Sequence, residues 1–339
     1  MRTQRLSLIV RVIVRITMPL ARFSSAFLAP VEAADLVPPP RFRAKDFAGF
    51  RIDLAVAGQG AAVAQVQAFA EKKCGFFSGL FAKKEKPGLY LDGGFGVGKT
   101  HLLAAAFNSA PGTTRYLSFA EAMSLLIVRG RESAIDLLTA DLVCIDEFEL
   151  DDPTNTRLAD LLVTGLMARR SRILTTSNTV PGELGQGRMA IDLFRTQLAR
   201  IEESFASIHV PGNDWRQKNA HSGQALVNWH ADVEPLTGVD CVTLHALQLD
   251  QWLADIPVIN LRRLAAMLTG LTVTEVEPFH NQLAALRFVH LIDKLYDYGV
   301  MLRVRSSTSI AELFPAEFCV AAFSKKYRRC ESRLTELCA

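Results

Sequence analysis

The chain of 339 residues exceeds what one hydrophobic core usually fills, so we expect two domains. Its composition, 49% hydrophobic and 22% charged, excludes a largely disordered chain, and six scattered cysteines without a CxxC pair indicate neither a zinc site nor a disulfide framework. The net charge of +3 is too small to indicate nucleic-acid binding by itself, because phosphate recognition needs clustered Lys and Arg.

Residues 1–35 form an arginine-rich leader, in which arginines interrupt apolar runs such as Leu8-Ile9-Val10 and no acid precedes Glu32. These runs are shorter than the roughly 20 apolar residues that span a membrane, and they contain no clean signal-peptide core. Two interpretations stay open: an amphipathic helix at a membrane surface, or a start placed too early, with Met18 as the true start. We prefer the second and expect the part before Pro38 to be dispensable for activity.

Residues 36–215 alternate between short apolar strands and helices, after a proline-rich start at 36–40. We expect strands at 89–91, 115–118, 142–145, 173–176 and 205–210, and helices at 99–107, after Pro153 and around 191–201. This alternation predicts an α/β fold: a mostly parallel sheet covered by helices on both faces, giving a three-layer αβα core.

Residues 216–339 have a different rhythm and predict a smaller, mainly helical domain. Helical patterns occupy 244–253, 260–268 and 282–298, and the last ends at Gly299, a suitable C-cap. A strand-like segment at 300–304 and a basic stretch at 325–329 complete this part of the chain.

A phosphate-binding loop lies between the first of these strands and the helix that follows it. The segment Gly93-Gly94-Phe95-Gly96-Val97-Gly98-Lys99-Thr100 has the spacing Gly-x-x-x-x-Gly-Lys-Thr. Its glycines let backbone N–H groups surround phosphates, Lys99 can reach the β- and γ-phosphates, and the Thr100 hydroxyl can bind Mg²⁺. The strand–loop–helix context favours this interpretation over a glycine-rich turn with an incidental lysine.

Two acidic residues follow the buried strand at 142–145. Asp146 stands at the carboxyl end of that strand, where ligands bind in parallel sheets, so we expect it to hold Mg²⁺. Glu147 comes next and can orient the attacking water. The acids after it, Glu149 among them, are explained by a solvated acidic loop, and Cys144 by core packing.

Two further candidates follow the strand at 173–176. Asn178 can hydrogen-bond the γ-phosphate or the water, although it would also suit a turn before Pro181. Arg188, ten residues later, can reach the nucleotide of a neighbouring subunit; the alternative is a solvated surface arginine.

Several stretches beyond these motifs identify a family. They are 87–94 (PGLYLDGG), 146–152 (DEFELDD), 176–181 (TSNTVP), 184–188 (LGQGR), 286–297 (LRFVHLIDKLYD) and 332–334 (SRL). With them the chain, from about Leu36 onwards, resembles the ZapE family of bacterial cell-division ATPases, which has mitochondrial AFG-type relatives. Residues 215–280 match weakly, and the leader lies outside the match.

The resemblance implies an AAA+ P-loop fold and Mg²⁺-dependent ATP hydrolysis. It further implies a ring-like homo-oligomer that contacts the tubulin-like division-ring protein in the cytoplasm, with peripheral contact to the membrane at the division site. Residues 216–339 correspond to a lid-like domain, whose sensor arginine is assigned to Arg287, with Arg333 as the alternative. The sequence does not identify the pore residues that grip a substrate, and Phe119 is only a guess.

A different class of protein has a similar loop. The segment Gly98-Lys99-Thr100-His101-Leu102 also resembles replication initiators and helicase loaders, with His101 beside the nucleotide. We expect no nucleic-acid partner, because the chain downstream contains no helix-turn-helix or basic aromatic module. A nucleotide-switched scaffold with little turnover would use the same residues, but Glu147 favours hydrolysis.

Overall fold

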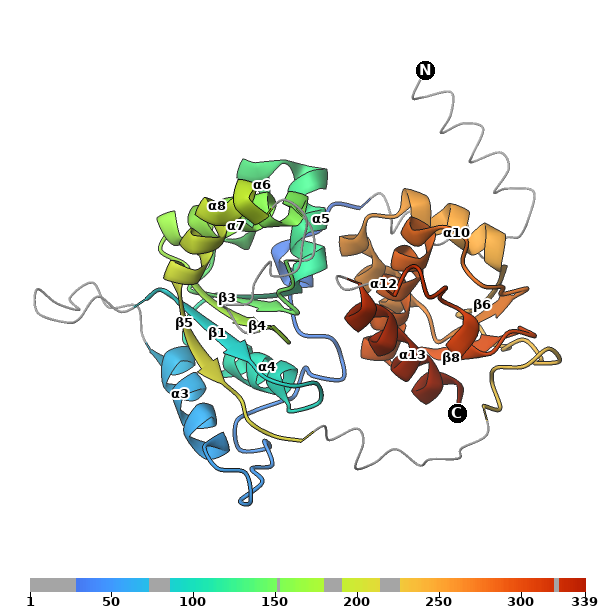
Figure 1. The fold of residues 1–339 in the computed structure, drawn as a ribbon, viewed down its shortest axis with the longest axis horizontal. Coiled ribbons are helices and arrows are strands. Elements are labelled where there is room, and N and C mark those ends of the chain that lie inside the picture. Colours follow the sequence, from blue (N-terminus) through green and yellow to red (C-terminus); the bar gives the residue numbers. More distant parts are fainter. Residues whose placement is uncertain (1–28, 73–85, 151–152, 180–190, 214–225, 320–322) are drawn as a thin grey trace, which may run out of the picture. The chain divides into compact units, whose positions relative to one another are not determined.

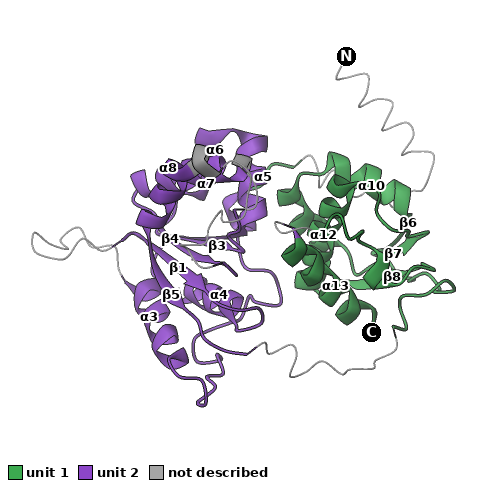
Figure 2. Ribbon diagram, viewed as in Figure 1, with its two compact units in different colours: residues 1–31, 224–320, 324–339 green, residues 32–223, 321–323 purple. Residues whose placement is uncertain are grey.

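The computed structural model describes residues 29–72, 86–150, 153–179, 191–213, 226–319 and 323–339 (Figure 1). The chain divides into two compact units, coloured separately in Figure 2. The five-stranded unit comprises residues 32–223 and 321–323, and the three-stranded unit comprises residues 1–31, 224–320 and 324–339. The predicted bounds 1–35, 36–215 and 216–339 stay a prediction.

The five-stranded unit contains a fully parallel sheet in the order β2-β3-β4-β1-β5. The strands are β1 Gly88–Asp92, β2 Thr114–Ser118, β3 Leu142–Asp146, β4 Arg172–Thr176 and β5 Phe205–His209. Both β1 and β3 are buried along their whole length, as parallel strands covered on both faces should be. The chain continues from β1 towards β2 at one edge of the sheet, and from the neighbouring strand β4 towards β5 at the other edge. Connections that leave neighbouring strands in opposite directions place a ligand crevice at the carboxyl ends of those strands.

Helices cover both faces of this sheet. They are α3 Gln59–Glu71, α4 Lys99–Ser109, α5 Phe119–Arg129, α6 Arg131–Leu138, α7 Pro153–Ala168 and α8 Ile191–Ser204, with a short 3-10 turn, η1, at Ala33–Asp35. Figure 1 shows α3 and α4 on one side of the sheet and α5 to α8 on the other. The predicted three-layer α/β core of the P-loop, AAA+ type is thereby confirmed.

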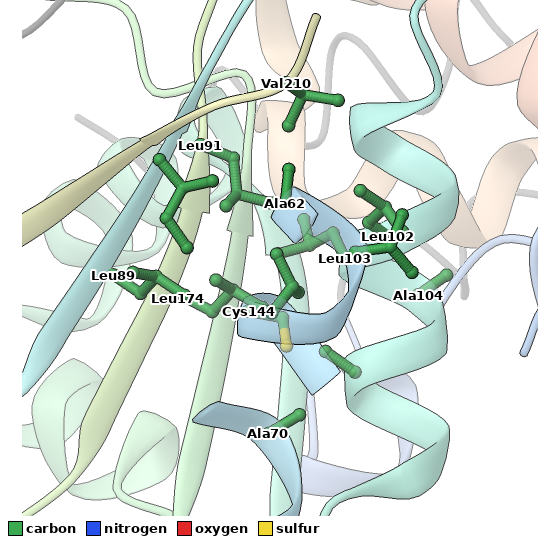
Figure 3. Close-up of a cluster of buried hydrophobic side chains, with 14 of the residues drawn as sticks. Ala62, Ala70, Leu89, Leu91, Leu102, Leu103, Ala104, Cys144, Leu174 and Val210 are labelled. Carbon is green, nitrogen blue, oxygen red and sulfur yellow. The ribbon is translucent and has the colours of Figure 1, made fainter. Parts of the chain in front are cut away.

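The hydrophobic core on the α4 side fixes the helix that follows the phosphate loop. Leucines of β1 and β4 face Leu102 and Leu103 of α4, and small alanines of α3 close the layer (Figure 3). Cys144 of β3 lies in the same cluster, fully buried, and burial raises the pKa of its thiol. This cysteine packs in the core, as predicted.

The three-stranded unit contains a second parallel sheet, in the order β6-β7-β8. Its elements are β6 Cys241–His245, α10 Ala246–Asp255, η3 Val258–Asn260, α11 Leu261–Met267, β7 Gly270–Thr274, α12 Gln282–Tyr298, β8 Met301–Val304, η4 Ile310–Glu312 and α13 Ser324–Cys338. Helix α12 has its predicted bounds and ends at Gly299, whose φ of 69° is left-handed. By contrast, β6 and β7 were not predicted, and the basic stretch at 325–329 belongs to α13.

The end of the predicted leader is packed against folded elements. Val31 is buried, and Leu36 is fully buried, with its carbonyl oxygen accepting a hydrogen bond from Tyr116 N at 2.8 Å. In the three-stranded unit, Arg263 donates to the carbonyl oxygens of Ala29 and Pro30 at 2.8 and 2.9 Å. Among the described residues, no helix is long and apolar enough to cross a membrane.

Candidate active site

Lys99 and Thr100 of the phosphate loop meet polar side chains that lie at the carboxyl ends of β3 and β4. Lys99 Nζ donates to the carbonyl oxygens of Gly93 and Gly94 at 2.8 and 2.6 Å, and to Asn178 Oδ1 at 2.9 Å. Thr100 Oγ1 lies 3.3 Å from Asp146 Oδ1. The structure thus brings together four of the side chains that the sequence singled out.

Two positions of the phosphate loop require glycine. Gly93 has φ +148°, and a Cβ there would lie 2.5 Å from the carbonyl oxygen of Val210. Gly98 has φ +93°, and its Cβ would lie 2.6 Å from the ring of Phe50. Val97 packs into the core, while Phe95 is 37% exposed. A loop built in this way leaves its backbone and the N-terminus of α4 open to an anion.

The ammonium of Lys99 is buried among acids. Burial lowers the pKa of Lys99 to about 8, although Asp146 and Asp92 oppose the shift. An ammonium has three hydrogens, and the three acceptors named above match that number. Any phosphate that Lys99 binds must therefore replace at least one of these bonds.

Four donors face the carboxylate of Asp146. Its Oδ1 accepts from Thr176 Oγ1 at 2.5 Å, from Glu147 N at 3.1 Å and from Thr100 Oγ1. Its Oδ2 accepts from the Tyr116 hydroxyl at 3.0 Å. The sequence analysis missed Tyr116 and Thr176, although the polar end of the strand at 173–176 was a signal for Thr176.

The backbone of Glu147 is strained. Its φ of 55° lies in the left-handed region, which costs a non-glycine residue about 1–3 kcal/mol. Its N–H donates to both Asp146 Oδ1 and Thr176 Oγ1, the latter at 3.0 Å, and these bonds hold the conformation. Strain of this kind is common at active sites and is compatible with a catalytic role for Glu147.

The side chain of Asn178 connects the phosphate loop to the segment after β3. Besides accepting from Lys99, Asn178 donates through Nδ2 to Glu149 Oε1 at 3.1 Å. Glu149 is only 6% exposed. The sequence analysis had placed Glu149 in a solvated acidic loop, and its burial corrects that prediction.

Three more residues that the sequence singled out are His101, Phe119 and Arg188. His101 contacts the carbonyl oxygen of Asp46 through Nε2 at 2.8 Å and stacks edge-on against Phe50, so its contact with nucleotide stays a prediction. Phe119 is 4% exposed and packs against Phe148, which contradicts its assignment as a pore residue. Arg188 lies outside the described residues.

Both arginines considered for the lid belong to the three-stranded unit. Arg287 donates to Asp250 Oδ1 at 2.7 Å, joining α12 to α10. Arg333 is buried and bonded to Asp293, which gives it a structural partner within its own unit. The sensor role of Arg287 stays a prediction.

Within the part of the chain that the structure describes, no group of three or more His, Cys, Asp or Glu side chains could hold a metal ion. Mg²⁺ is usually held by one or two carboxylates together with substrate phosphates and water. The pair Thr100 and Asp146 provides oxygen donors of this kind.

The chain matches known proteins along most of its length. The model of the AFG1-like ATPase family matches residues 33–236 and 237–339. The cell division protein ZapE of Escherichia coli strain K12 is 26% identical over 305 residues, which cover 74% of this chain and 77% of that protein. ZapE of strain O157:H7 matches equally well.

Solved structures match less closely. A crystal structure of DnaI is 20% identical, with a TM-score of 0.42, covering 54% of this chain and 98% of that one. AMPPCP-bound DnaA from Aquifex aeolicus is 19% identical, with a TM-score of 0.36, covering 58% and 57%.

Proposed function

Because the chain belongs to the AFG1-like ATPase family, we propose that it hydrolyses Mg²⁺-bound ATP at the loop of residues 93–100. One observation carries this proposal: at the ends of three neighbouring strands, Lys99 lies within hydrogen-bond distance of Asn178, and Thr100 lies within hydrogen-bond distance of Asp146. ATPase activity is the family's property, and the site supplies the residue types that this chemistry needs.

The residues present suit ATP and Mg²⁺. The loop approaches its surroundings too closely at Gly93 and Gly98 for a side chain, which leaves backbone N–H groups for the phosphates. Lys99 would bind the β- and γ-phosphates, and Thr100 and Asp146 would hold Mg²⁺. When bound there, Mg²⁺ would neutralise charge on the phosphate oxygens.

Hydrolysis then depends on residues that act on the water and the γ-phosphate. In this proposal Glu147 accepts the proton of the attacking water, and Asn178 donates a hydrogen bond to the γ-phosphate or to the water. Arg188 of a neighbouring subunit stabilises the negative charge that develops in the transition state, and Arg287 acts as the sensor in the lid.

The proposed partners follow from the relative rather than from the site. The Escherichia coli relative is named a cell division protein. We therefore place this chain in the cytoplasm at the division site, as a ring-like homo-oligomer that acts on the division-ring protein and touches the membrane peripherally. DNA and RNA are not among the proposed partners.

The test is the steady-state ATPase rate of the full chain, with Mg²⁺ or EDTA, with or without DNA, and with or without the tubulin-like division-ring protein. We expect a rate that needs Mg²⁺, ignores DNA and changes with the division-ring protein. Strong stimulation by DNA that falls steeply with salt would instead support a replication initiator or helicase loader. Tight ATP binding without turnover would support a nucleotide-switched scaffold.

A further inference from the structure

The amide of Asn178 is held at both of its ends, by groups of opposite hydrogen-bonding character. Lys99 Nζ can only donate and meets Oδ1 at 2.9 Å, whereas the Glu149 carboxylate can accept and meets Nδ2 at 3.1 Å. The opposite orientation of the amide would place a donor against the ammonium and an acceptor against the carboxylate. The two neighbours therefore select one of the two orientations.

Glu149 is held in place by the backbone on either side of it. Phe148 and Leu150 are both fully buried, and Phe148 N donates to the carbonyl oxygen of Thr176 at 2.7 Å. With both neighbours fixed in the core, Glu149 has little freedom to leave Asn178. Its 6% exposure separates this bond from an ordinary surface contact, which water would weaken.

Asn178 is anchored in a similar way. Ser177 N donates to the carbonyl oxygen of Leu91 at 2.8 Å, and the Tyr90 hydroxyl donates to the carbonyl oxygen of Thr179 at 2.8 Å. Both residues next to Asn178 are thus tied to β1. The contact between Asn178 and Glu149 joins two rigid segments, so it fixes the plane of the amide.

The number of hydrogen-bonding groups on the Asn178 amide shows how its contact with Glu149 can affect the reaction. An asparagine amide has one acceptor and two N–H donors. Lys99 occupies the acceptor and Glu149 one donor, which leaves one N–H in a direction set by the other two. Lys99 must give up at least one of its three bonds to reach a phosphate. The bond that Asn178 donates to Glu149 does not depend on Lys99.

We propose that Glu149 is a positioning residue: it holds the Asn178 amide so that its remaining N–H points at the γ-phosphate or the attacking water. This inference rests on the proposed function, in which Asn178 donates a hydrogen bond to the γ-phosphate or the water. Glu149 acts through Asn178 and takes no proton from water. The function of the site then extends beyond Glu147 to the third residue after Asp146.

The experiment compares two substitutions, Glu149→Gln and Glu149→Met, whose new side chains are similar in length. Both remove the charge, but only glutamine retains an oxygen that accepts from Asn178 Nδ2. We expect Glu149→Met to lower kcat about tenfold, the order of one hydrogen bond to a charged group, and Glu149→Gln to lower it no more than about threefold. ADP, which has no γ-phosphate, should bind both variants as it binds the unsubstituted chain.

The same two substitutions are then made together with Asn178→Ala. If Glu149 acts through Asn178, the Gln and Met variants should now agree in kcat to within about twofold. A difference between them that persists without the Asn178 side chain overturns the proposal. So does a loss of a hundredfold or more in Glu149→Gln, on the order of what a lost catalytic base costs.

Thermal unfolding of each variant shows whether it is folded, and Glu149→Ala replaces Glu149→Met if the latter is not. Equal activities of the Gln and Met variants in the presence of Asn178 also overturn the positioning role. If the unsubstituted chain hydrolyses no Mg²⁺-bound ATP, the proposed function itself fails. The two failures are therefore distinguishable.

Discussion

At the residue scale, Lys99 is the side chain on which nucleotide binding most depends. Its ammonium is held over the phosphate loop by two carbonyl oxygens and Asn178, where it can meet phosphate oxygens. We expect Lys99→Ala to weaken ATP binding at least about 100-fold, because two or more hydrogen bonds to a charged group are lost. Calorimetric titration with ATP measures this.

Lys86 offers a matched control, since its ammonium also donates to two carbonyl oxygens, those of Glu202 and Phe205, where β5 begins. Lys86 precedes β1, whereas the phosphate loop follows the opposite end of that strand. We therefore expect Lys86→Ala to leave the affinity for ATP unaltered. Unchanged affinity in Lys99→Ala would mean that residues 93–100 do not bind phosphate.

A substitution of Glu147 should lower the turnover of ATP without weakening its binding. Glu147→Gln keeps the length of the side chain and places the same demand on the left-handed backbone, so we expect ATP to bind as before. Turnover should fall by about 10²-fold or more, the range found when a general base is removed. Steady-state ATPase assays at saturating ATP give kcat, and normal turnover would show that the base is another residue.

At the element scale, α12 and α13 of the three-stranded unit share a buried ion cluster. Asp293 of α12 accepts from Arg329 Nη2 at 2.8 Å and from Arg333, both on α13. Burial alone would raise the pKa of Asp293, but the two guanidiniums outweigh it and hold that pKa well below its usual range. The cluster ties the two helices together as long as the carboxylate is charged.

We expect Asp293→Asn to destabilise the three-stranded unit by about 3–5 kcal/mol, because it removes the charge of the carboxylate that both buried guanidiniums share. A depressed pKa contributes stability above the unfolded value of about 3.9, and that contribution is lost as pH falls below it. The difference between the variant and the unsubstituted chain should therefore shrink below about pH 4. Urea unfolding across pH measures both effects.

The control for this prediction is Asp250→Asn, which removes the partner of Arg287 in the same unit. That pair is partly exposed, so we expect a change of about 1 kcal/mol or less. Equal effects of the two substitutions would show that the buried cluster is no more important than the exposed pair.

The strands and helices that surround the phosphate loop were predictable, because there the local patterns agree with the tertiary structure. The strands at the C-terminal end were harder to predict. Strand β6 runs straight into α10 through His245, whose Nδ1 accepts from Leu247 N at 3.1 Å, and helical periodicity from Leu244 hid the strand. Strand β7 begins at Gly270, and glycine is uncommon in strands.

The site was predictable only as far as its motifs extend. Lys99, Thr100 and Asp146 stand at fixed places in such motifs. Tyr116 and Glu149 reach the site because β2 and β4 lie on either side of β3. A linear sequence does not give this order of strands. Such residues need the register: Tyr116 is paired with Cys144, on the same face as Asp146 two residues further along.

At the scale of the whole molecule, the packed N-terminal segment changes where the chain can be shortened. The sequence led us to expect that everything before Pro38 is dispensable. Leu36 is fully buried and bonded to Tyr116, however, and Arg263 holds the carbonyl oxygens of Ala29 and Pro30.

We now expect a chain that begins at Ala29 to keep the melting temperature and ATPase rate of the full chain. One that begins at Pro38 should melt several degrees lower, since burying a leucine is worth about 1.5–3 kcal/mol. Differential scanning calorimetry compares the three chains. A chain lacking residues 1–28 that folds but no longer hydrolyses ATP would show that the leader takes part in the reaction.

The last prediction concerns the proposed oligomer and Arg188. Arg188 follows Asn178 by ten residues in the sequence, and we propose that it serves ATP bound to the neighbouring subunit. An arginine in this role is worth roughly 10³–10⁵ in rate, far more than a surface arginine contributes. Arg188→Ala should therefore bind ATP and hydrolyse it poorly.

Mixing subunits tests whether the arginine acts between them. Lys99→Ala lacks nucleotide binding but keeps Arg188, so a mixed oligomer with Arg188→Ala can pair one intact loop with one intact arginine. Some ATPase activity should then return, and mixing Lys99→Ala with itself under a different affinity tag is the control. If mixed oligomers demonstrably form and remain as inactive as the separate variants, Arg188 does not act across the interface, and its role reverts to that of a solvated surface residue.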